Sequence, residues 1–389
     1  MQLDLIQASL REAALDGWLF FDHHRRDPLA YRILGLPEDL SPSRRWYYFL
    51  PATGEPRKLV HRIESGALDK IPGSKYLYSS WTGQQQELQT LLHGVKKIAM
   101  QYSPKCAVPY VSLVDAGTIE LVRSTGVEIV TSANLVQQFE SVWTERQFQL
   151  HLEAGKLVDK SLREAFDFAA EKLRAKHPLT EYEVQQFIRH RFSHYGLHTE
   201  HGPIVAVNAN ASDPHYEPSC DRTAHIQQGD VLLIDLFAKL TQPDAVYYDI
   251  TWTGFCGEVI PETVQNVFEI VRDARKRGSQ FVIDKVARHA TIAGFEVDDA
   301  VRGFIEQKGY GEYFFHRTGH SIGAEVHGTG ANMDNFESHD ERRILAGSCF
   351  SIEPGIYLPE FGIRSEVNVY VGEGFASVTG EEQEQLVHL

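Results

Sequence analysis

The chain of 389 residues contains only four cysteines, and their scarcity excludes two kinds of site. They lie far apart and form no C-x-x-C pair, so we expect neither a disulfide framework nor a zinc site built from thiolates. Long apolar runs are also missing, and none approaches the roughly 20 residues that a membrane-spanning helix needs. The cysteines are Cys106, Cys220, Cys256 and Cys349.

Basic residues are few as well. The chain has 38 Lys and Arg against 53 Asp and Glu, which gives a net charge of −15. Nucleic-acid binding depends on clustered Lys and Arg, so no nucleic-acid partner is expected. The first residues contain Asp4 and Glu12 within an amphipathic pattern and lack the layout of a secretory signal. We therefore expect no membrane partner and a cytoplasmic location.

Residues 1–140 alternate between helix-like and strand-like segments and predict an α/β domain. Leu3, Ile6 and Leu10 follow helical spacing, and four short apolar runs are typical of strands. This region contains no convincing cluster of catalytic residue types. Its basic run at residues 22–26 could be a metal or anion patch, but it is more typical of a solvated loop. The predicted strands are 18–21, 46–50, 97–102 and 127–132.

A domain boundary is expected close to residue 140, because two helix-start signals follow it. Thr144 with Gln147 and Thr180 with Glu183 each fit a capping box, in which two side chains satisfy unpaired backbone N–H groups. Apolar residues then recur at helical spacing, and the second of these helices is expected to end at Gly196. Further helix patterns begin at residue 261 and end at residue 309.

The second part of the chain contains one pattern twice. An apolar strand pattern ends in an acid, and another acid follows 14 or 13 positions later. Each occurrence comes after two helix patterns, and the occurrences are 118 and 117 positions apart when measured between corresponding acids. This repetition predicts a pseudo-symmetric domain whose two hairpins face each other. The acids are Asp235 and Asp249 in the first half and Glu353 and Glu366 in the second.

Four converging acids predict a metal site. A buried carboxylate costs on the order of several kcal/mol unless it is paired or bound to metal. The His- and Gly-rich segment 316–328 offers the nitrogen ligand that such a set lacks. Carboxylates suit manganese or a similar ion, whereas imidazole also tolerates Zn, Co or Fe. Five such ligands would hold two ions about 3.5–4 Å apart, as in two-metal hydrolases. The alternative is that each acid separately caps a turn or pairs with an arginine.

At these residues the chain resembles a known family. Residues from about 145 to 389 are similar to the M24-type metallopeptidases (the creatinase and methionine aminopeptidase type), whose catalytic domain has the pita-bread fold. Residues 1–140 resemble, more weakly, the N-terminal domain of the aminopeptidase P and prolidase branch. The matching stretches are 211–216, 231–236, 247–254, 316–328, 350–357 and 362–369.

The resemblance implies an α/β (α+β) architecture with two domains. Residues 1–140 would form a creatinase-like α/β domain. Residues 141–389 would form a pseudo-two-fold catalytic domain with a curved antiparallel sheet flanked by helices. A short proline-containing peptide would be the substrate, and the chain would form a homodimer.

Position by position, the resemblance implies five metal ligands. Asp249 and Glu366 would bridge two divalent ions, most plausibly Mn, with Co or Zn as alternatives. Asp235 would hold one ion, whereas His320 and Glu353 would hold the other. Water activated between the ions would attack the peptide carbonyl.

Further roles are implied for residues around these ligands. Glu353 would also carry the proton from the water to the leaving nitrogen. His215, His316 and His327 would bind substrate or steady the tetrahedral intermediate, and Arg364 would orient the site.

The chain departs from the family pattern at three places close to the ligands. Phe237 stands where a Gly is usual after the first ligand, and the interval from Asp235 to Asp249 is longer than usual. Trp252 stands where an Arg is common. We expect these differences to alter the pocket wall and the preferred substrate size. Asp244 could rival Asp249 as a ligand, but only Asp249 lies in the matching D-I-T stretch.

The reading that combines these features is a dinuclear-metal Xaa-Pro dipeptidase, or prolidase. An Xaa-Pro aminopeptidase acting on longer peptides would use the same metals. A creatinase-like C–N hydrolase works without metals, so the complete acid set argues against it. A catalytically inactive pita-bread module that binds proteins is a weaker alternative, because such modules generally lose ligands. A helix-end group of histidines, among them His201, is more typical of a surface.

Overall fold

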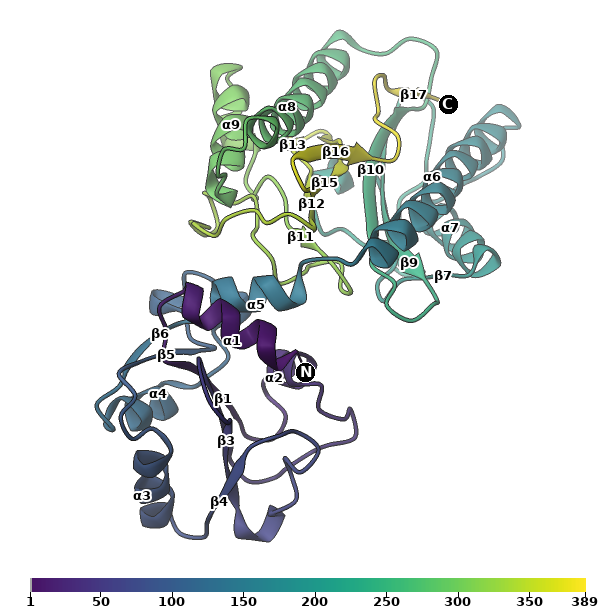
Figure 1. Cartoon of the computed structure of the whole chain (residues 1–389). Coiled ribbons are helices and arrows are strands. Elements are labelled where there is room, and N and C mark those ends of the chain that lie inside the picture. The colour runs from purple at the N-terminus through teal and green to yellow at the C-terminus, as the bar shows by residue number, and fades with distance from the viewer. Residues whose placement is uncertain (1) are drawn as a thin grey trace. The chain divides into compact units, whose positions relative to one another are not determined.

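The structure, a computed structural model, describes residues 2–389. The chain forms two compact units, Met1–Glu140 and Ser141–Leu389, which are coloured from purple to blue and from teal to yellow in Figure 1. No helix within residues 2–389 is both long and apolar enough to cross a membrane. The 3-10 turns are η1 (Arg62–Glu64), η2 (Pro104–Cys106), η3 (Pro109–Val111), η4 (Asn208–Ser212) and η5 (Gly311–Tyr313).

The first unit is a six-stranded mixed sheet in the order β4-β3-β2-β1-β5-β6, with apolar clusters on both faces. Only β2 runs against its neighbours, so the carboxyl ends of the other five strands lie at one edge. The strands are β1 (Gly17–Asp22), β2 (Trp46–Pro51), β3 (Arg57–His61), β4 (Ser74–Tyr78), β5 (Lys97–Met100) and β6 (Glu128–Thr131). The helices are α1 (Leu3–Glu12), α2 (Pro28–Leu34), α3 (Trp81–Leu91), α4 (Ala116–Arg123) and α5 (Ala133–Glu140).

These elements confirm the predicted alternation of helices and strands. The predicted strands at 18–21 and 46–50 are present with nearly the expected bounds. The strand predicted at 97–102 ends earlier, at Met100, because Tyr102 turns back to bond the carbonyl of Met100. Alternate residues of β1 and β2 enter the two apolar clusters, which explains why both strands are buried throughout.

The second unit begins with a helix pair that the two capping boxes predict. Thr144 and Gln147 exchange hydrogen bonds at the start of α6, and Thr180 and Glu183 do so at the start of α7. Gly196 ends α7 in the left-handed conformation, with a φ of 69°, as its position predicted. The four helices of this unit are α6 (Glu145–Arg174), α7 (Glu181–Tyr195), α8 (Glu262–Ala287) and α9 (Gly294–Gln307).

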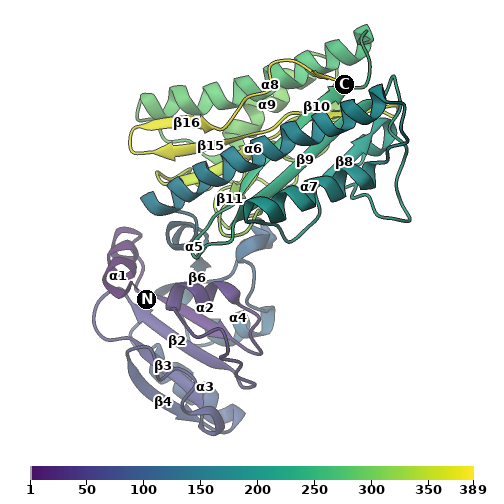
Figure 2. The same ribbon diagram turned by 90° about the vertical axis from the view of Figure 1, so that its right-hand side faces the viewer.

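Each helix pair covers its own sheet, so the predicted repetition of the two halves is present. In Figure 2, α6 and α7 lie over β8 and β9, with which they share an apolar core. The first sheet contains β7 (Leu197–His198), β8 (Ile204–Val207), β9 (Val231–Leu240), β10 (Tyr248–Phe255) and β17 (Val387–His388). The second contains β11 (Ser321–Ile322), β12 (Ser348–Ile352), β15 (Val367–Gly372) and β16 (Phe375–Thr379). Along the chain, a hairpin of β13 (Gly355–Tyr357) and β14 (Gly362–Arg364) lies between β12 and β15, which pair with each other.

The two sheets meet where β10 approaches β15. The backbone N–H of Glu366 donates to the carbonyl of Thr251 over 3.1 Å. The Asn368 side chain donates to the carbonyl of Asp249 over 2.6 Å and accepts from its N–H over 3.1 Å. These bonds bring the acid-bearing segments of the two halves side by side.

Candidate metal centre

Strand alternation sets the direction of the acids in the first half. Leu232, Ile234 and Leu236 of β9 pack against α6 and α7, so Asp235 faces the opposite side of the sheet. Thr251 of β10 pairs directly with Asp235, and Asp249 faces the same side two residues earlier. Asp235 lies in the middle of β9, so the prediction that it ends the strand is wrong. The strand continues to residue 240 because β7 and β10 both pair with its second half.

The acids of the second half lie at the ends of strands. Glu353 directly follows β12, as predicted, and its N–H donates to the carbonyl of Thr318 over 2.8 Å. Glu366 lies between β14 and β15 rather than within a strand, which corrects the prediction of a second acid-bearing strand in this half. The inserted β13–β14 hairpin interrupts the pairing there.

The structure brings the five predicted ligands together. Asp249, His320 and Glu366 each offer one atom, and these atoms lie within 4.8 Å of one another. His320 Nε2 is 3.3 Å from a Glu353 oxygen and 3.6 Å from an Asp249 oxygen. Asp235 joins the group from β9 and, with Glu353, repels the charge of Asp249.

The histidine presents a lone pair, not a proton, to these acids. Its Nδ1 lies 3.2 Å from the carbonyl oxygen of Ser321, which can only accept, so Nδ1 carries the proton. Burial, followed by the proximity of His327 and Arg317, lowers the pKa of His320 well below its ordinary value. The neutral ring therefore directs an unprotonated Nε2 at carboxylate oxygens, and a cation between them resolves this repulsion.

The carboxylates also fit a cation. Asp235 Oδ1, Asp249 Oδ1 and Glu366 Oε1 are buried and lack any hydrogen-bond partner among residues 2–389. Burial and mutual repulsion raise the pKa of Asp249 and of Glu366 well above the ordinary range, and raise that of Glu353 to about 7. Ionising this cluster of carboxylates without a bound cation costs free energy, whereas divalent ions would stabilise its negative charge. The residues present therefore fit a metal centre.

Arg364 and Thr251 hold two of the acids in place by hydrogen bonds. Arg364 is 2% exposed and donates from Nη2 to Asp235 over 2.6 Å. Its Nε lies 3.2 Å from the hydroxyl of Thr251, which itself donates to Glu366 Oε2 over 2.7 Å. One guanidinium thus orients an acid of β9 directly and an acid beside β15 through a hydroxyl.

His316 belongs to the same network, through Tyr357. Its Nδ1 donates to the carbonyl of Arg317 over 2.7 Å, so its Nε2 accepts from the Tyr357 hydroxyl, also over 2.7 Å. That hydroxyl accepts in turn from Arg364 Nη1 over 3.0 Å. His316 therefore reaches the acids only through two intermediates and supports their position.

The other two predicted histidines lie on the side of His320. The ring of His327 stands perpendicular to that of His320, with the centroids 4.4 Å apart. Desolvation, followed by the charges of Arg317, His215 and His201, lowers the pKa of His327 to about 4. His215 is exposed, and its backbone is held by Asp213. His201, which the sequence favoured as a surface residue, is exposed but lies close enough to act on His327.

The segment that carries His316 and His320 is held by α9. Buried Asp298 accepts from the N–H and hydroxyl of Thr318 over 3.0 and 2.6 Å, and Arg302 donates to the carbonyl of His316 over 2.7 Å. Gly319 passes so close to β12 that a Cβ there would lie 1.9 Å from the Ser351 carbonyl oxygen. Only glycine permits this close approach to β12, and the approach fixes the position of the neighbouring His320 relative to the acids.

The residues at which the chain departs from the family pattern have different environments. Trp252 is partly buried on the helix-covered face of β10, where Ile250 also lies, so the prediction that it alters the pocket wall is wrong. Phe237 lies on the acid-bearing face and pairs with Asp249 across the hairpin. Asp244 is exposed in the loop between β9 and β10, away from the cluster.

Three polar residues of the centre were not predicted: Thr251, Tyr357 and Asn368. All three lie within stretches that carry the family resemblance, and strand alternation alone would have placed Thr251 beside Asp249. The contacts of Tyr357 and Asn368 join segments far apart in sequence, which no local pattern reports.

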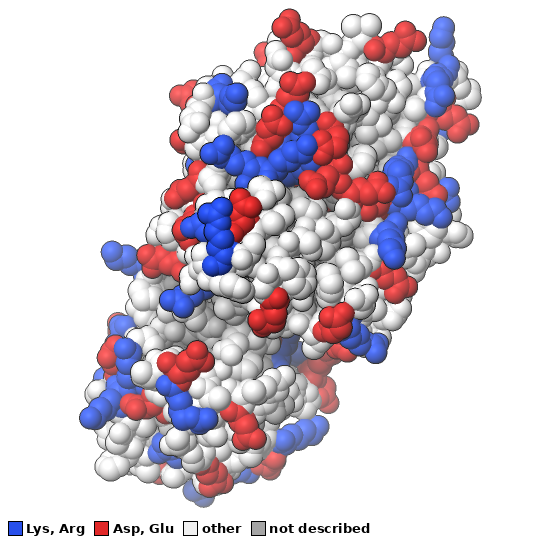
Figure 3. Space-filling view, turned by 45° about the horizontal axis from the view of Figure 1, so that its top comes forward, with Lys and Arg blue, Asp and Glu red and all other residues white. Residues whose placement is uncertain are grey.

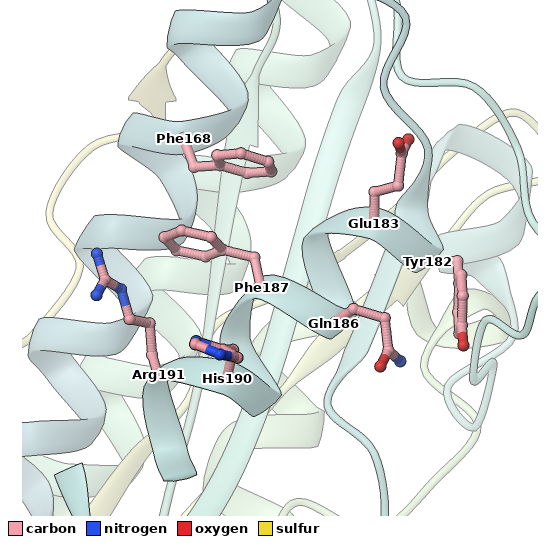
Figure 4. A pocket seen from close by; sticks show the side chains of 7 residues that line it. All are labelled: Phe168, Tyr182, Glu183, Gln186, Phe187, His190 and Arg191. Atoms are coloured by element: carbon pink, nitrogen blue, oxygen red, sulfur yellow. The ribbon is translucent and has the colours of Figure 1, made fainter. Parts of the chain in front are cut away.

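A second hollow in this unit contains none of the residues of the candidate metal centre. A hollow of about 490 Å³ between α6 and α7 contains Phe168 stacked on Phe187 at 4.4 Å, with Arg191 over the second ring (Figure 4). None of the predicted ligands lines it. On the face seen in Figure 3, acidic and basic side chains are interspersed, without a broad basic surface.

Comparison with known proteins identifies the family. The model of metallopeptidase family M24 matches residues 149–373, which contain the whole acid cluster. This chain belongs to metallopeptidase family M24. Within the family, its relatives place it in the branch of prolidase and aminopeptidase P.

The sequence identities to individual relatives are modest. The putative dipeptidase YkvY of Bacillus subtilis is 29% identical over 68% of this chain and 67% of its own length. An Xaa-Pro dipeptidase of Lactobacillus delbrueckii is 34% identical, but the match covers 48% of this chain and 47% of that protein. Dipeptidase PepE from Mycobacterium ulcerans has a similar structure, with a TM-score of 0.73 and 24% identity over 99% of this chain and 96% of its own. A prolidase from Thermococcus sibiricus gives a TM-score of 0.66 over 100% and 98%, also at 24% identity.

Proposed function

We propose that this M24 metallopeptidase is an Xaa-Pro dipeptidase with two divalent ions. The observation that carries the proposal is a cluster of four carboxylates, two of which lie within 3.6 Å of the unprotonated Nε2 of His320, with three carboxylate oxygens lacking any partner among residues 2–389. The names of several relatives support the substrate class, because they are Xaa-Pro dipeptidases.

The five predicted ligands would hold the ions. Asp235, Asp249, Glu353 and Glu366 would supply carboxylate oxygens, and His320 would supply its Nε2. When bound, the ions would polarise the scissile carbonyl and acidify a water molecule. Because oxygen donors dominate, we propose Mn²⁺ as the physiological ion.

The remaining steps are assigned to side chains of this chain. Glu353 would take the proton of the attacking water and deliver it to the leaving nitrogen, which in an Xaa-Pro bond has no N–H of its own. His327 would donate a hydrogen bond to the developing oxyanion. Arg364 would hold the Asp235 carboxylate in place by its 2.6 Å hydrogen bond.

An Xaa-Pro aminopeptidase is the second candidate, because solved structures of such enzymes share the fold, with a TM-score of 0.59 for an X-Pro aminopeptidase of Thermotoga maritima. Homodimer formation and a cytoplasmic location stay predictions of the sequence.

Kinetics on matched substrates would test the proposal. The Mn²⁺-loaded protein should cleave Xaa-Pro dipeptides with a much higher kcat/KM than the tripeptides that extend them. Equal or faster cleavage of tripeptides would contradict the dipeptidase assignment and favour the aminopeptidase. Absence of cleavage from both, with metal bound, would favour a binding module. Glu353→Ala and His320→Ala should abolish turnover while the protein stays folded by circular dichroism.

A further inference from the structure

The N-terminal unit contains a hollow that the proposed peptidase chemistry does not use. It has a volume of about 450 Å³ and lies at the edge of the sheet where β1, β3 and β4 end and β2 begins. In open α/β sheets, ligands bind outside the carboxyl ends of the strands. Three arginines line this hollow: Arg26, Arg44 and Arg45.

The loop that carries Arg26 is fixed by a buried acid. Asp22 is 1% exposed and accepts from the N–H groups of Arg25, Arg26 and Asp27 over 2.9, 2.6 and 3.0 Å. The Tyr31 hydroxyl donates to the same carboxylate over 3.0 Å. The run 22–26 is a loop beside β1 with His24, Arg25 and Arg26 exposed, as expected, and the hydrogen bonds to Asp22 fix its backbone.

The other two arginines are held just as firmly through their backbones. Glu64 accepts from the N–H of Arg44 over 2.9 Å, and the Tyr78 hydroxyl donates to the carbonyl of Arg45 over 2.7 Å. The ring of His61 packs edge-on against Tyr78 at 4.9 Å. The backbone around the hollow is thus organised before any ligand arrives, which lowers the entropic cost of binding.

The guanidinium groups, by contrast, are not bound to carboxylates, and Arg44 donates from Nη1 to the hydroxyl of Ser43 over 2.7 Å. Within residues 2–389, none of the three forms an ion pair with a carboxylate. Arg32, in the following helix α2, does pair with a carboxylate, that of Glu140.

Three acids lie near the arginines, namely Asp22, Asp115 and Glu64, and each also has other partners. Asp115 also lines the hollow, but its carboxylate accepts from the N–H and hydroxyl of Thr118 over 2.9 and 2.8 Å. Glu64 is committed to Ser43 and to the backbone of Arg44. Partial burial, followed by the charges of His24, Arg26 and Arg45, lowers the pKa of His23. The hollow thus presents three arginine side chains that form no ion pair within residues 2–389.

An aromatic surface stands beside these charges. Trp81 is 70% exposed although it begins α3, and it lines the same hollow. An exposed indole next to guanidinium groups that have no carboxylate partner suits a planar group attached to an anion.

We propose that this hollow binds a small organic anion, with Arg26, Arg44 and Arg45 contacting a phosphate or carboxylate group and Trp81 stacking on a planar body. The site lies wholly within residues 1–140 and shares no residue with the metal centre. The proposal therefore does not depend on the proposed peptidase activity.

Calorimetric titration of the full-length, metal-loaded protein with phenyl phosphate tests this site. Benzoate, inorganic phosphate and phenol are the comparison ligands. We expect saturable binding of phenyl phosphate and benzoate, weaker binding of inorganic phosphate and none of phenol. The tighter of the first two identifies the anionic group. Equal binding of phenol, or no saturable binding of any anion, would overturn the proposal.

Variants locate the binding. The double variant Arg26→Gln/Arg45→Gln should bind phenyl phosphate at least about tenfold more weakly, because two charge-assisted hydrogen bonds are lost. Arg123→Gln changes an exposed arginine that lies over Tyr102 and should bind like the wild type. Trp81→Ala should lower the affinity for phenyl phosphate to that for inorganic phosphate. Unchanged affinity in a double variant with a normal Tm would contradict the proposal and assign the anion to another site, such as the metal centre.

Discussion

The side chain of Asn368 makes two hydrogen bonds to the backbone of Asp249, one to its N–H and one to its carbonyl. Asn368 belongs to β15 of one half and Asp249 to β10 of the other, so this amide joins the two halves at the central ligand. Both residues are buried, and water does not compete for these bonds. Asn368 is thus a positioning residue for Asp249.

Replacing this amide should therefore weaken metal binding. Asn368→Ala leaves two buried backbone groups of Asp249 without partners and frees the strand to move, so we expect a loss of about 10- to 100-fold in Mn²⁺ affinity. Isothermal titration measures it. Gln280→Ala removes a surface amide that only bonds Asp284 and should leave the affinity unchanged. Equal affinity in Asn368→Ala and the wild type would contradict the role.

Thr251 should matter through its hydroxyl and not its shape. Thr251→Val is nearly isosteric but removes the donor to Glu366 and the acceptor for Arg364. Leaving these groups unpaired costs about 1–3 kcal/mol. We expect a lower Tm and weaker metal binding, both restored largely by Thr251→Ser. A serine variant as impaired as the valine variant would show that the methyl packing, and not the hydroxyl, is needed.

The N-terminal unit should lose stability as pH rises, because of Asp27. This acid is 2% exposed, caps α2 through Ala30, and has one oxygen without a hydrogen-bond partner among the residues that the structure describes. Burial, opposed by the Ala30 N–H and reinforced by nearby Asp22, raises its pKa from 3.8 to about 7. Between these values the folded chain holds a proton that the unfolded chain has released, so stability falls from about pH 4 to pH 7.

Asp27→Asn keeps the cap and removes the buried charge. We expect it to stabilise the protein at pH 8 by on the order of 2 kcal/mol and hardly at all at pH 4, as measured by urea unfolding. Asp115→Asn is the matched control. Hydrogen bonds from Thr118 hold the pKa of Asp115 low in spite of some burial, so its substitution should destabilise at pH 8. A stabilisation by Asp27→Asn that is the same at both pH values would refute the titration argument.

Gly319 should tolerate no side chain. Its Cβ position overlaps the carbonyl of Ser351, so Gly319→Ala must push the His320 segment away from β12. Overpacking of this kind costs about 1–3 kcal/mol, and we expect Mn²⁺ binding to weaken with it. Gly303→Ala is the control, because its Cβ on α9 would meet no atom within 4 Å and alanine favours helix. A metal affinity in Gly319→Ala equal to that of Gly303→Ala would contradict the argument.

Local patterns predicted the elements well because local physics decides them. Capping boxes at Thr144 and Thr180 depend on residues three positions apart, and both helices begin there. The repeated acid spacing likewise indicated that distant segments converge. Trp252 was assigned to the wrong face, although its separation of three residues from Asp249 already puts the two side chains on opposite sides of a strand.

The sequence could not predict the hydrogen bonds between segments that are brought together only by tertiary folding. The bonds of Asn368, Tyr357 and Thr251 join segments more than 40 residues apart or depend on the β13–β14 hairpin, which no short-range pattern places. The charge state of the metal centre could not be predicted either. The raised pKa values of Asp249 and Glu366 arise from burial next to the other acids, which only the tertiary structure brings about.

Counting bound metal at equilibrium tests the central claim most directly. The folded protein, dialysed against Mn²⁺ and analysed by mass spectrometry, should retain about two ions per chain, the number for which the donor set is suited. The double variant Asp249→Asn/Glu366→Gln, folded by circular dichroism, should retain almost none. A wild-type protein that binds no divalent ion, or a double variant that binds as many as the wild type, would contradict the account.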